Sequence, residues 1–103
     1  MTTTLEILIG ARAIVERGWS QRAGYRNASG HVCFAADATH HCPIAAILVS
    51  SHPVASSEKA IEALRQVTGQ PNIVAWSDAP ERTKAEVLEA FDEAIRRVKA
   101  GAP

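Results

Sequence analysis

The chain has 103 residues, of which 47% are apolar and 21% are charged. This length predicts a single domain over residues 1–103 with a core of its own, because folding at this size hides about two-thirds of the surface that the unfolded chain exposes. The 11 basic and 11 acidic side chains give a formal net charge of zero. This balance argues against a nucleic-acid-binding protein, since such proteins usually carry a basic excess.

The start of the chain lacks the pattern of a targeting signal or a membrane span. It has no basic leader, and Glu6 interrupts its short apolar run. We therefore expect a cytoplasmic protein that does not contact a membrane. In that reducing compartment the two cysteines, Cys33 and Cys42, are predicted to be free thiols.

Residues 4–17 are predicted to form the first helix. Thr3 and Glu6 have the spacing of a capping box, and the apolar residues that follow recur at the helical period. We expect Gly18 to end this helix in the left-handed conformation and Trp19 to fold back onto the apolar stripe. The stripe consists of Ile7, Leu8, Ala11, Ile14 and Val15.

Residues 20–35 are predicted to form a short antiparallel hairpin. Tyr25 precedes a run of turn-forming residues at 27–30, and an apolar segment at 32–34 follows it. Because two isolated strands are marginally stable in water, we expect this pair to lie against helices. Residues 37–41 are predicted to be a polar connector.

Two further helices are predicted in the middle of the chain. Residues 43–51 start with a proline and are almost wholly apolar, which predicts a helix that is buried on every side. Residues 58–68 are predicted to form the next helix, with Ser56 or Ser57 as its cap and Gly69 as its stop signal.

The C-terminal part of the chain is predicted to contain a connector, a long helix and a frayed three-residue tail. Residues 72–78 read as a short apolar connector that could be extended. Thr83 and Glu86 form a second capping box before a helix of at least three turns. On that helix Asp92 is expected to pair with Arg96, and Glu93 with Arg97. These elements together predict a compact, mainly helical α+β domain with about four helices and one short antiparallel hairpin.

Four stretches of the chain, taken in order, resemble the pattern of a family of small, uncharacterised bacterial and phage domains. That pattern has a helix ending in Gly-Trp-x-Gln, a helix start of the form Cys-x-x-Gly-Ala-Leu, and a Trp-Asn-Asp followed by Arg-Thr-x-x-Glu-Val. Ala45 stands in place of the glycine and Ser77 in place of the asparagine. The resemblance implies a shared fold and no established activity. The matching stretches are residues 18–21, 42–47, 76–78 and 82–87.

Cys42 is the first candidate for a catalytic residue. It directly precedes an apolar helix, whose dipole and unpaired N–H groups could stabilise a thiolate. A thiol-dependent hydrolase or transferase could use this thiol with His41 as base, or alternatively His40 or His52. Asp78 would be the partner of the histidine, and Gln21 an oxyanion donor. The alternative is a small buried thiol that only packs at a helix start, which is the commoner role of a free cysteine.

A cluster of possible zinc ligands lies within twelve residues. A zinc site needs about four thiolate or imidazole donors, but neighbouring residues point in different directions and the chain has no Cys-x-x-Cys motif. We therefore predict no metal site and no cofactor. The members of the cluster are His31, Cys33, His40, His41 and Cys42.

Residues 76–83 are a candidate binding segment with a structural alternative. Trp76, Asp78 and Arg82 would offer an aromatic ring, a carboxylate and a guanidinium to a peptide or a small polar ligand. Alternatively, Asp78 accepts hydrogen bonds within its turn and pairs with Arg82, while Trp76 is buried. We expect the structural roles to dominate, because each residue has a local task with a stated mechanism.

Four further residues are binding candidates in the first third of the chain. We expect Trp19 mainly to pack in the core and only secondarily to contact a ligand. Gln21 could act as a hydrogen-bond donor. Tyr25 and Arg26, together with Arg22, form a basic and aromatic grouping that would suit a phosphate or a stacked base. A charged hairpin edge explains this grouping equally well.

The leading hypothesis is a non-enzymatic protein-binding or regulatory module with an unknown protein partner. It depends mainly on the absence of a Gly-rich phosphate loop, a paired-carboxylate motif and a nucleophile elbow from the sequence. A homodimer is one form of this hypothesis, because Leu5 and Ile9 point away from the main stripe of the first helix. The alternative function is the thiol enzyme that uses Cys42.

Overall fold

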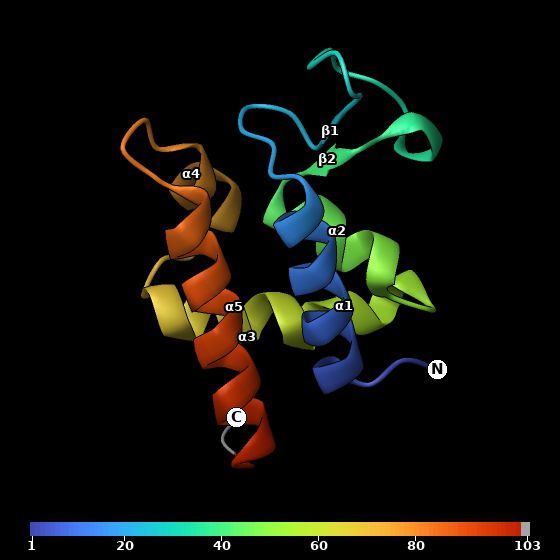
Figure 1. Ribbon diagram of the computed structural model, residues 1–103. Coiled ribbons are helices and arrows are strands. Elements are labelled where there is room, and N and C mark those ends of the chain that lie inside the picture. The colour runs from blue at the N-terminus through green and yellow to red at the C-terminus, as the bar shows by residue number, and fades with distance from the viewer. Residues whose placement is uncertain (102–103) are drawn as a thin grey trace.

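The structure of the protein is a computed structural model, and it describes residues 1–101 (Figure 1). Two short strands form an antiparallel sheet, and the helices account for most of the remaining chain. The predicted class, mainly helical α+β with one two-stranded sheet, is confirmed. The helices are α1 (Thr4–Arg17), α2 (Pro43–Ser50), α3 (Ser57–Thr68), α4 (Ile73–Asp78) and α5 (Lys84–Lys99); the strands are β1 (Tyr25–Arg26) and β2 (His40–His41); and the 3-10 turns are η1 (Ala35–Asp37) and η2 (Val54–Ser56).

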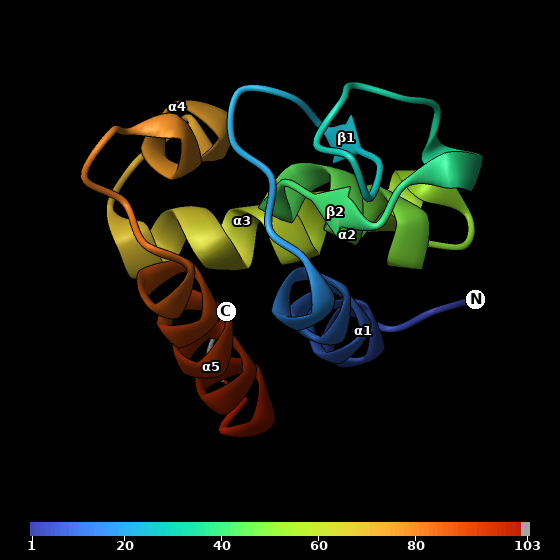
Figure 2. The ribbon, with the colours of Figure 1, turned by 45° about the horizontal axis from the view of Figure 1, so that its top comes forward.

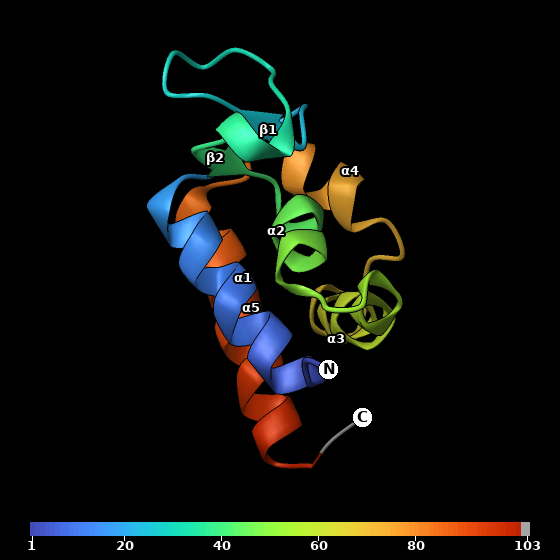
Figure 3. The same ribbon diagram turned by 90° about the vertical axis from the view of Figure 1, so that its right-hand side faces the viewer.

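The core lies between α1, α2, α3 and α5 (Figure 2), and α1 and α5 run side by side (Figures 1 and 3). It is filled by the apolar stripes of these helices, and burial of one such side chain stabilises the fold by about 1.5–3 kcal/mol. The stripe predicted for α1 is therefore the face that packs. No helix within residues 1–101 is long and apolar enough to cross a membrane. The largest fully buried apolar side chains are Phe91, Ile7, Leu8, Ile47, Leu64, Val15 and Val87.

Two predicted capping boxes are present and define where α1 and α5 begin. The Thr3 hydroxyl accepts the backbone N–H of Glu6 at 3.1 Å, and the Glu6 carboxylate accepts that of Thr3 at 2.9 Å. Thr83 and Glu86 form the same reciprocal pair at 3.2 and 2.9 Å. Gly69 ends α3, as predicted, and it has the left-handed conformation at φ 69°. Each cap satisfies N–H or C=O groups that a helix end leaves without a partner.

The left-handed conformation predicted for Gly18 is wrong. Its φ is −173°, which is extended backbone. A glycine is needed here because there is no room for a side chain: a Cβ at this position would lie 2.2 Å from the carbonyl oxygen of Thr39. The residue therefore lets the chain that leaves α1 pass directly against the chain that enters β2.

The local pairing predicted for the hairpin forms only in part. β1 pairs with β2, with Tyr25 opposite His41 and Arg26 opposite His40, whereas Val32 forms only an isolated bridge to Arg26. The segment predicted as a polar connector thus supplies the second strand. β2 is hydrogen-bonded on both sides, because the His41 N–H also donates to the Gly18 carbonyl and the His41 carbonyl accepts the Ser20 N–H. A purely local hairpin would leave these backbone groups of His41 unpaired.

Three helical predictions need correction. α2 is not buried on every side, since Ile44 and Leu48 are half-buried and Val49 is 39% exposed. Residues 72–78 are not a connector but form α4, because the Asn72 side chain accepts the Ala75 N–H at 3.0 Å and caps a short helix. α3 begins one residue early, and no serine side chain caps it.

The ion pair predicted between Asp92 and Arg96 does not form. Asp92 instead accepts from the Arg12 side chain across the α1–α5 contact, with the closer N–O distance at 2.6 Å. Arg96 pairs with Glu93. The expected pair between Glu93 and Arg97 is present, with an N–O distance of 2.8 Å. Of the expected frayed tail, only Gly101 lies among the described residues, and residues 102 and 103 lie outside them.

Candidate functional site

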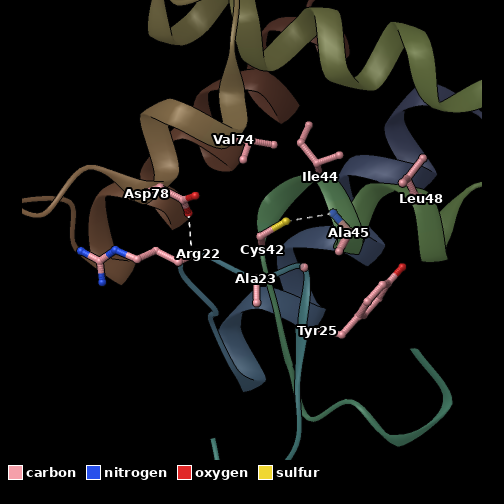
Figure 4. Close-up of a pocket in the computed structure, with 10 residues that line it drawn as sticks. Arg22, Ala23, Tyr25, Cys42, Ile44, Ala45, Leu48, Val74 and Asp78 are labelled. Carbon is pink, nitrogen blue, oxygen red and sulfur yellow. Dashed lines mark hydrogen bonds between the residues drawn. The ribbon is translucent and has the colours of Figure 1, made fainter. Parts of the chain in front are cut away.

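A cavity of about 320 Å³ opens between α2, α4 and the chain at residues 22–25 (Figure 4). Its walls are mainly apolar, and Cys42, Arg22 and Asp78 are its only residues with a charged or thiol side chain. It brings together three sequence candidates, Cys42, Asp78 and Tyr25, from separate parts of the chain. The lining consists of Arg22, Ala23, Gly24, Tyr25, Cys42, Ile44, Ala45, Leu48, Val74 and Asp78.

The unburied side of α2 forms one wall of this cavity. Ile44 and Leu48 stand four residues apart, so that they lie on the same side of the helix. Both are half-buried and line the cavity. Val74 of α4, which is 43% exposed, faces them across the opening. The side of α2 that is not fully buried, contrary to the prediction, therefore forms a wall of the cavity.

Cys42 is the N-cap of α2, and its thiol is held in a structural contact. The side chain is 7% exposed, and Sγ accepts the backbone N–H of Ala45 at 3.3 Å. Burial raises the pKa of Cys42, and the charge of Asp78 raises it further, while N–H groups at the start of the helix oppose both effects. The thiol is thus kept protonated, whereas an activated nucleophile needs a lowered pKa.

His41 lies on a different side of the chain from the Cys42 cavity. Its ring is 5.4 Å from that of Tyr25 in an edge-to-face arrangement, and it lines a separate hollow with Arg17 and Ile14. Burial lowers its pKa, and the nearby positive charge of Arg17 adds to this effect. Within residues 1–101 no histidine lines the cavity that contains Cys42. The structure therefore joins Cys42 with Asp78 but does not join His41 to them.

Asp78 is held in place by the backbone of Arg22. Arg22 has a left-handed conformation at φ 63°, which costs a residue with a side chain about 1–3 kcal/mol. In this conformation its N–H donates to Asp78 Oδ1 at 2.8 Å. The strained residue therefore fixes a carboxylate at the edge of the cavity.

The predicted pair between Arg82 and Asp78 is wrong. The Arg82 guanidinium lies over the Trp76 ring, 4.4 Å from its centroid, and donates to the Trp76 carbonyl at 3.0 Å. Its ion-pair partner is Glu86, at 3.5 Å. Trp76 and Arg82 consequently form a structural corner between α4 and α5, and they do not line the cavity.

Trp19 and Gln21 connect the chain after α1 to α4. The Trp19 ring N–H donates to the Ser77 hydroxyl at 3.1 Å. Gln21 Nε2 donates to the carbonyls of Ser77 and Ala79 at 2.9 and 3.1 Å. Because these donors are already used, the structure does not support Gln21 as an oxyanion donor. Both residues hold the segment that carries Arg22 against α4.

A long loop between β1 and β2 contains the features that the sequence interpretation missed. It stands away from the helices at the top of Figure 1, and it carries Phe34 at 85% exposure and Val32 at 68%. Arg26 stabilises its base by donating to the Gly30 carbonyl at 2.9 Å. The turn residues before Val32 are visible in the sequence, but the apolar residues that follow them predict a strand rather than an exposed loop.

No three histidine, cysteine or acidic side chains within the described residues come close enough together to hold a metal ion. The five residues weighed as zinc ligands are spread over the exposed loop, β2 and the start of α2. Cys33 and Cys42 are both free thiols.

Comparison with known proteins gives one match. No curated protein and no solved structure matches the chain. A family described as "Family of unknown function (DUF6197)" matches residues 1–97, which is nearly the whole chain. The expectation of a family without an established activity is confirmed, and the chain belongs to DUF6197.

Proposed function

We propose that this protein is a non-enzymatic protein-binding module and that the loop at residues 27–38 inserts Val32 and Phe34 into an apolar recess of its partner. One observation carries the proposal: two large apolar side chains of one loop are exposed, Phe34 at 85% and Val32 at 68%. Burial of such a side chain in an interface contributes about 1.5–3 kcal/mol. Buried aromatic anchors of this kind often dominate the binding energy of an interface.

The base of the loop supports this role because it is ordered before any partner binds. The Asn27 side chain accepts the backbone N–H groups of Ser29 and His31 at 3.0 and 3.1 Å. Arg26 accepts the Thr39 N–H at 2.9 Å through its carbonyl. A loop that is already shaped loses less conformational entropy on binding.

The other functional predictions have less support. The thiol enzyme needs an activated Cys42, and the pKa of this thiol is raised. For the homodimer, Leu5 is half-buried and Ile9 is 47% exposed on α1, which leaves a small apolar patch. The homodimer and the cytoplasmic location remain predictions.

The test is a comparison of Phe34→Ser with Val54→Ser. Val54 is the matched control because it is 60% exposed on η2, outside the loop. A photoreactive group at position 34 would identify a partner in extracts, and calorimetry with the purified partner would then compare the variants. We expect Phe34→Ser to weaken binding at least tenfold and Val54→Ser to leave it unchanged. Equal affinity of Phe34→Ser and the unaltered protein would overturn the proposal.

A further inference from the structure

We propose that the cavity between α2, α4 and residues 22–25 binds a small ligand that carries a protonated amine on an apolar body. This site is separate from the exposed loop and does not depend on the protein-binding role. Three features determine the ligand chemistry: the size of the cavity, its apolar walls and the charge at its edge.

The size and walls of the cavity define the body of the ligand. A volume of about 320 Å³ lies at the lower end of the range of about 300–1,000 Å³ that small-molecule sites span. Ile44, Leu48 and Val74 supply aliphatic contact, and the Tyr25 ring lies at the opposite end from Asp78 (Figure 4). A short aliphatic or aromatic body therefore fits better than a sugar or a nucleotide.

Asp78 defines the polar group of the ligand. Its Oδ1 accepts a backbone N–H at 2.8 Å, but within residues 1–101 the carboxylate has no ion-pair partner. The only other charged residue of the lining is Arg22, and Figure 4 shows its guanidinium pointing away from Cys42 and Ile44. The negative charge of Asp78 acts on a group that lines the cavity, since it contributes to the raised pKa of Cys42.

An ammonium group is the natural partner for this carboxylate. A hydrogen bond between two charged groups is shorter and stronger than one between neutral groups. A carboxylate on the ligand would be repelled by Asp78, and a hydroxyl would gain no charge attraction. The left-handed backbone of Arg22 already holds the Asp78 carboxylate at the edge, so ligand binding need not first order this residue.

Three six-carbon probes test the proposal on the unaltered protein: hexylamine, hexan-1-ol and hexanoate. Hexylamine is protonated at pH 7, because the pKa of a primary alkylamine such as lysine is about 10.4. Two-dimensional ¹H–¹⁵N NMR titrations at low salt should show hexylamine shifting amides of residues 22–25, 42–48 and 74–78. We expect hexylamine to bind roughly fivefold more tightly than hexan-1-ol, with hexanoate the weakest. Equal or tighter binding of hexanoate, or shifts spread over the whole surface, would overturn the proposal.

A pair of variants assigns the selectivity to Asp78. Asp78→Asn keeps an oxygen for the Arg22 N–H but removes the charge, so hexylamine should bind no better than hexan-1-ol. Asp37→Asn removes the same charge from an exposed residue of η1 outside the cavity and should leave hexylamine binding unchanged. If both variants bind hexylamine like the unaltered protein, the assignment is wrong. Phe34→Ser should not affect hexylamine binding, which separates this test from that of the protein-binding role.

Discussion

The layer formed by α1, α3 and α5 and the segment at residues 18–41 are held together in different ways. In the helical layer, side chains such as Ile7, Leu8 and Phe91 are 0% exposed, and apolar burial supplies the stability. In the segment at 18–41 the bulky residues Val32 and Phe34 face solvent. Backbone hydrogen bonds within that segment hold its shape. Hydrogen bonds that involve a side chain, such as those from Trp19 to Ser77 and from the Arg22 N–H to Asp78, attach it to α4.

This difference separates stability from function within one small domain. The side chains of the helical layer are used for packing, so few of them are available to a partner. The segment at 18–41 contributes the exposed loop and one wall of the cavity, and both proposed sites therefore depend on it. Substitutions should consequently act on stability in one region and on binding in the other.

The largest expected effect comes from the two phenylalanines, one in each region. Phe91→Ala removes a fully buried ring from α5 and should lower the free energy of unfolding by about 3–5 kcal/mol. Phe34→Ala removes a ring that is 85% exposed and should change it by less than about 0.5 kcal/mol. Urea denaturation measures both values. Similar losses for the two variants would contradict the division of roles.

Gly18→Ala should cause the next largest loss of stability, because Gly18 lies where the two regions meet. The added Cβ would lie 2.2 Å from a backbone oxygen, so the chain must shift, at a cost of about 1–3 kcal/mol. Gly24→Ala is the matched control, since its Cβ would make an ordinary contact of 3.6 Å with Ala45. Its effect should lie between neutral and about 1 kcal/mol of stabilisation. Thermal denaturation would show the difference, and equal melting temperatures would argue against the close approach at Gly18.

A smaller effect is expected from the ion pair that joins α1 and α5. A double-mutant cycle on Arg12 and Asp92 should give a coupling free energy of about 0.5–1 kcal/mol, because the pair is partly exposed. A cycle on Asp92 and Arg96 should give a value near zero. Coupling between Asp92 and Arg96 but not between Arg12 and Asp92 would mean that Asp92 pairs within α5 and not across the contact with α1.

The smallest effect concerns the start of α5 and depends on pH. The hydrogen bond from the Thr83 N–H lowers the pKa of Glu86 below its usual 4.5. Its stabilising contribution is therefore complete above pH 4.5 and is lost as pH falls through the lowered pKa of the folded state. Glu86→Gln should lower the melting temperature slightly at pH 7 and have no effect at a pH near 2. Glu89→Gln, which removes the same charge from an exposed residue of the same helix outside the capping box, is the matched control at both pH values.

The candidate sites could be predicted only in part. The sequence grouped Cys42 and Asp78 in one hypothetical site and indicated Tyr25 as a separate candidate, and the structure brings all three to one cavity. It also placed His41 and Gln21 beside Cys42, but His41 lines another hollow and Gln21 is bonded to α4. Residue types indicate which chemistry is available, whereas the direction of a side chain depends on backbone contacts far away in the sequence.

The sequence by itself determined the long helices and where they begin. Capping boxes at Thr3 and Thr83 and the apolar period behind them involve residues within four positions, so their physics is contained in a short window. Only the tertiary structure decided which segment pairs with β1, which side of α2 stays open and what Asp78 binds. Those outcomes depend on contacts such as that between Trp19 and Ser77, 58 positions apart, because burial and hydrogen bonding are satisfied over the whole molecule at once.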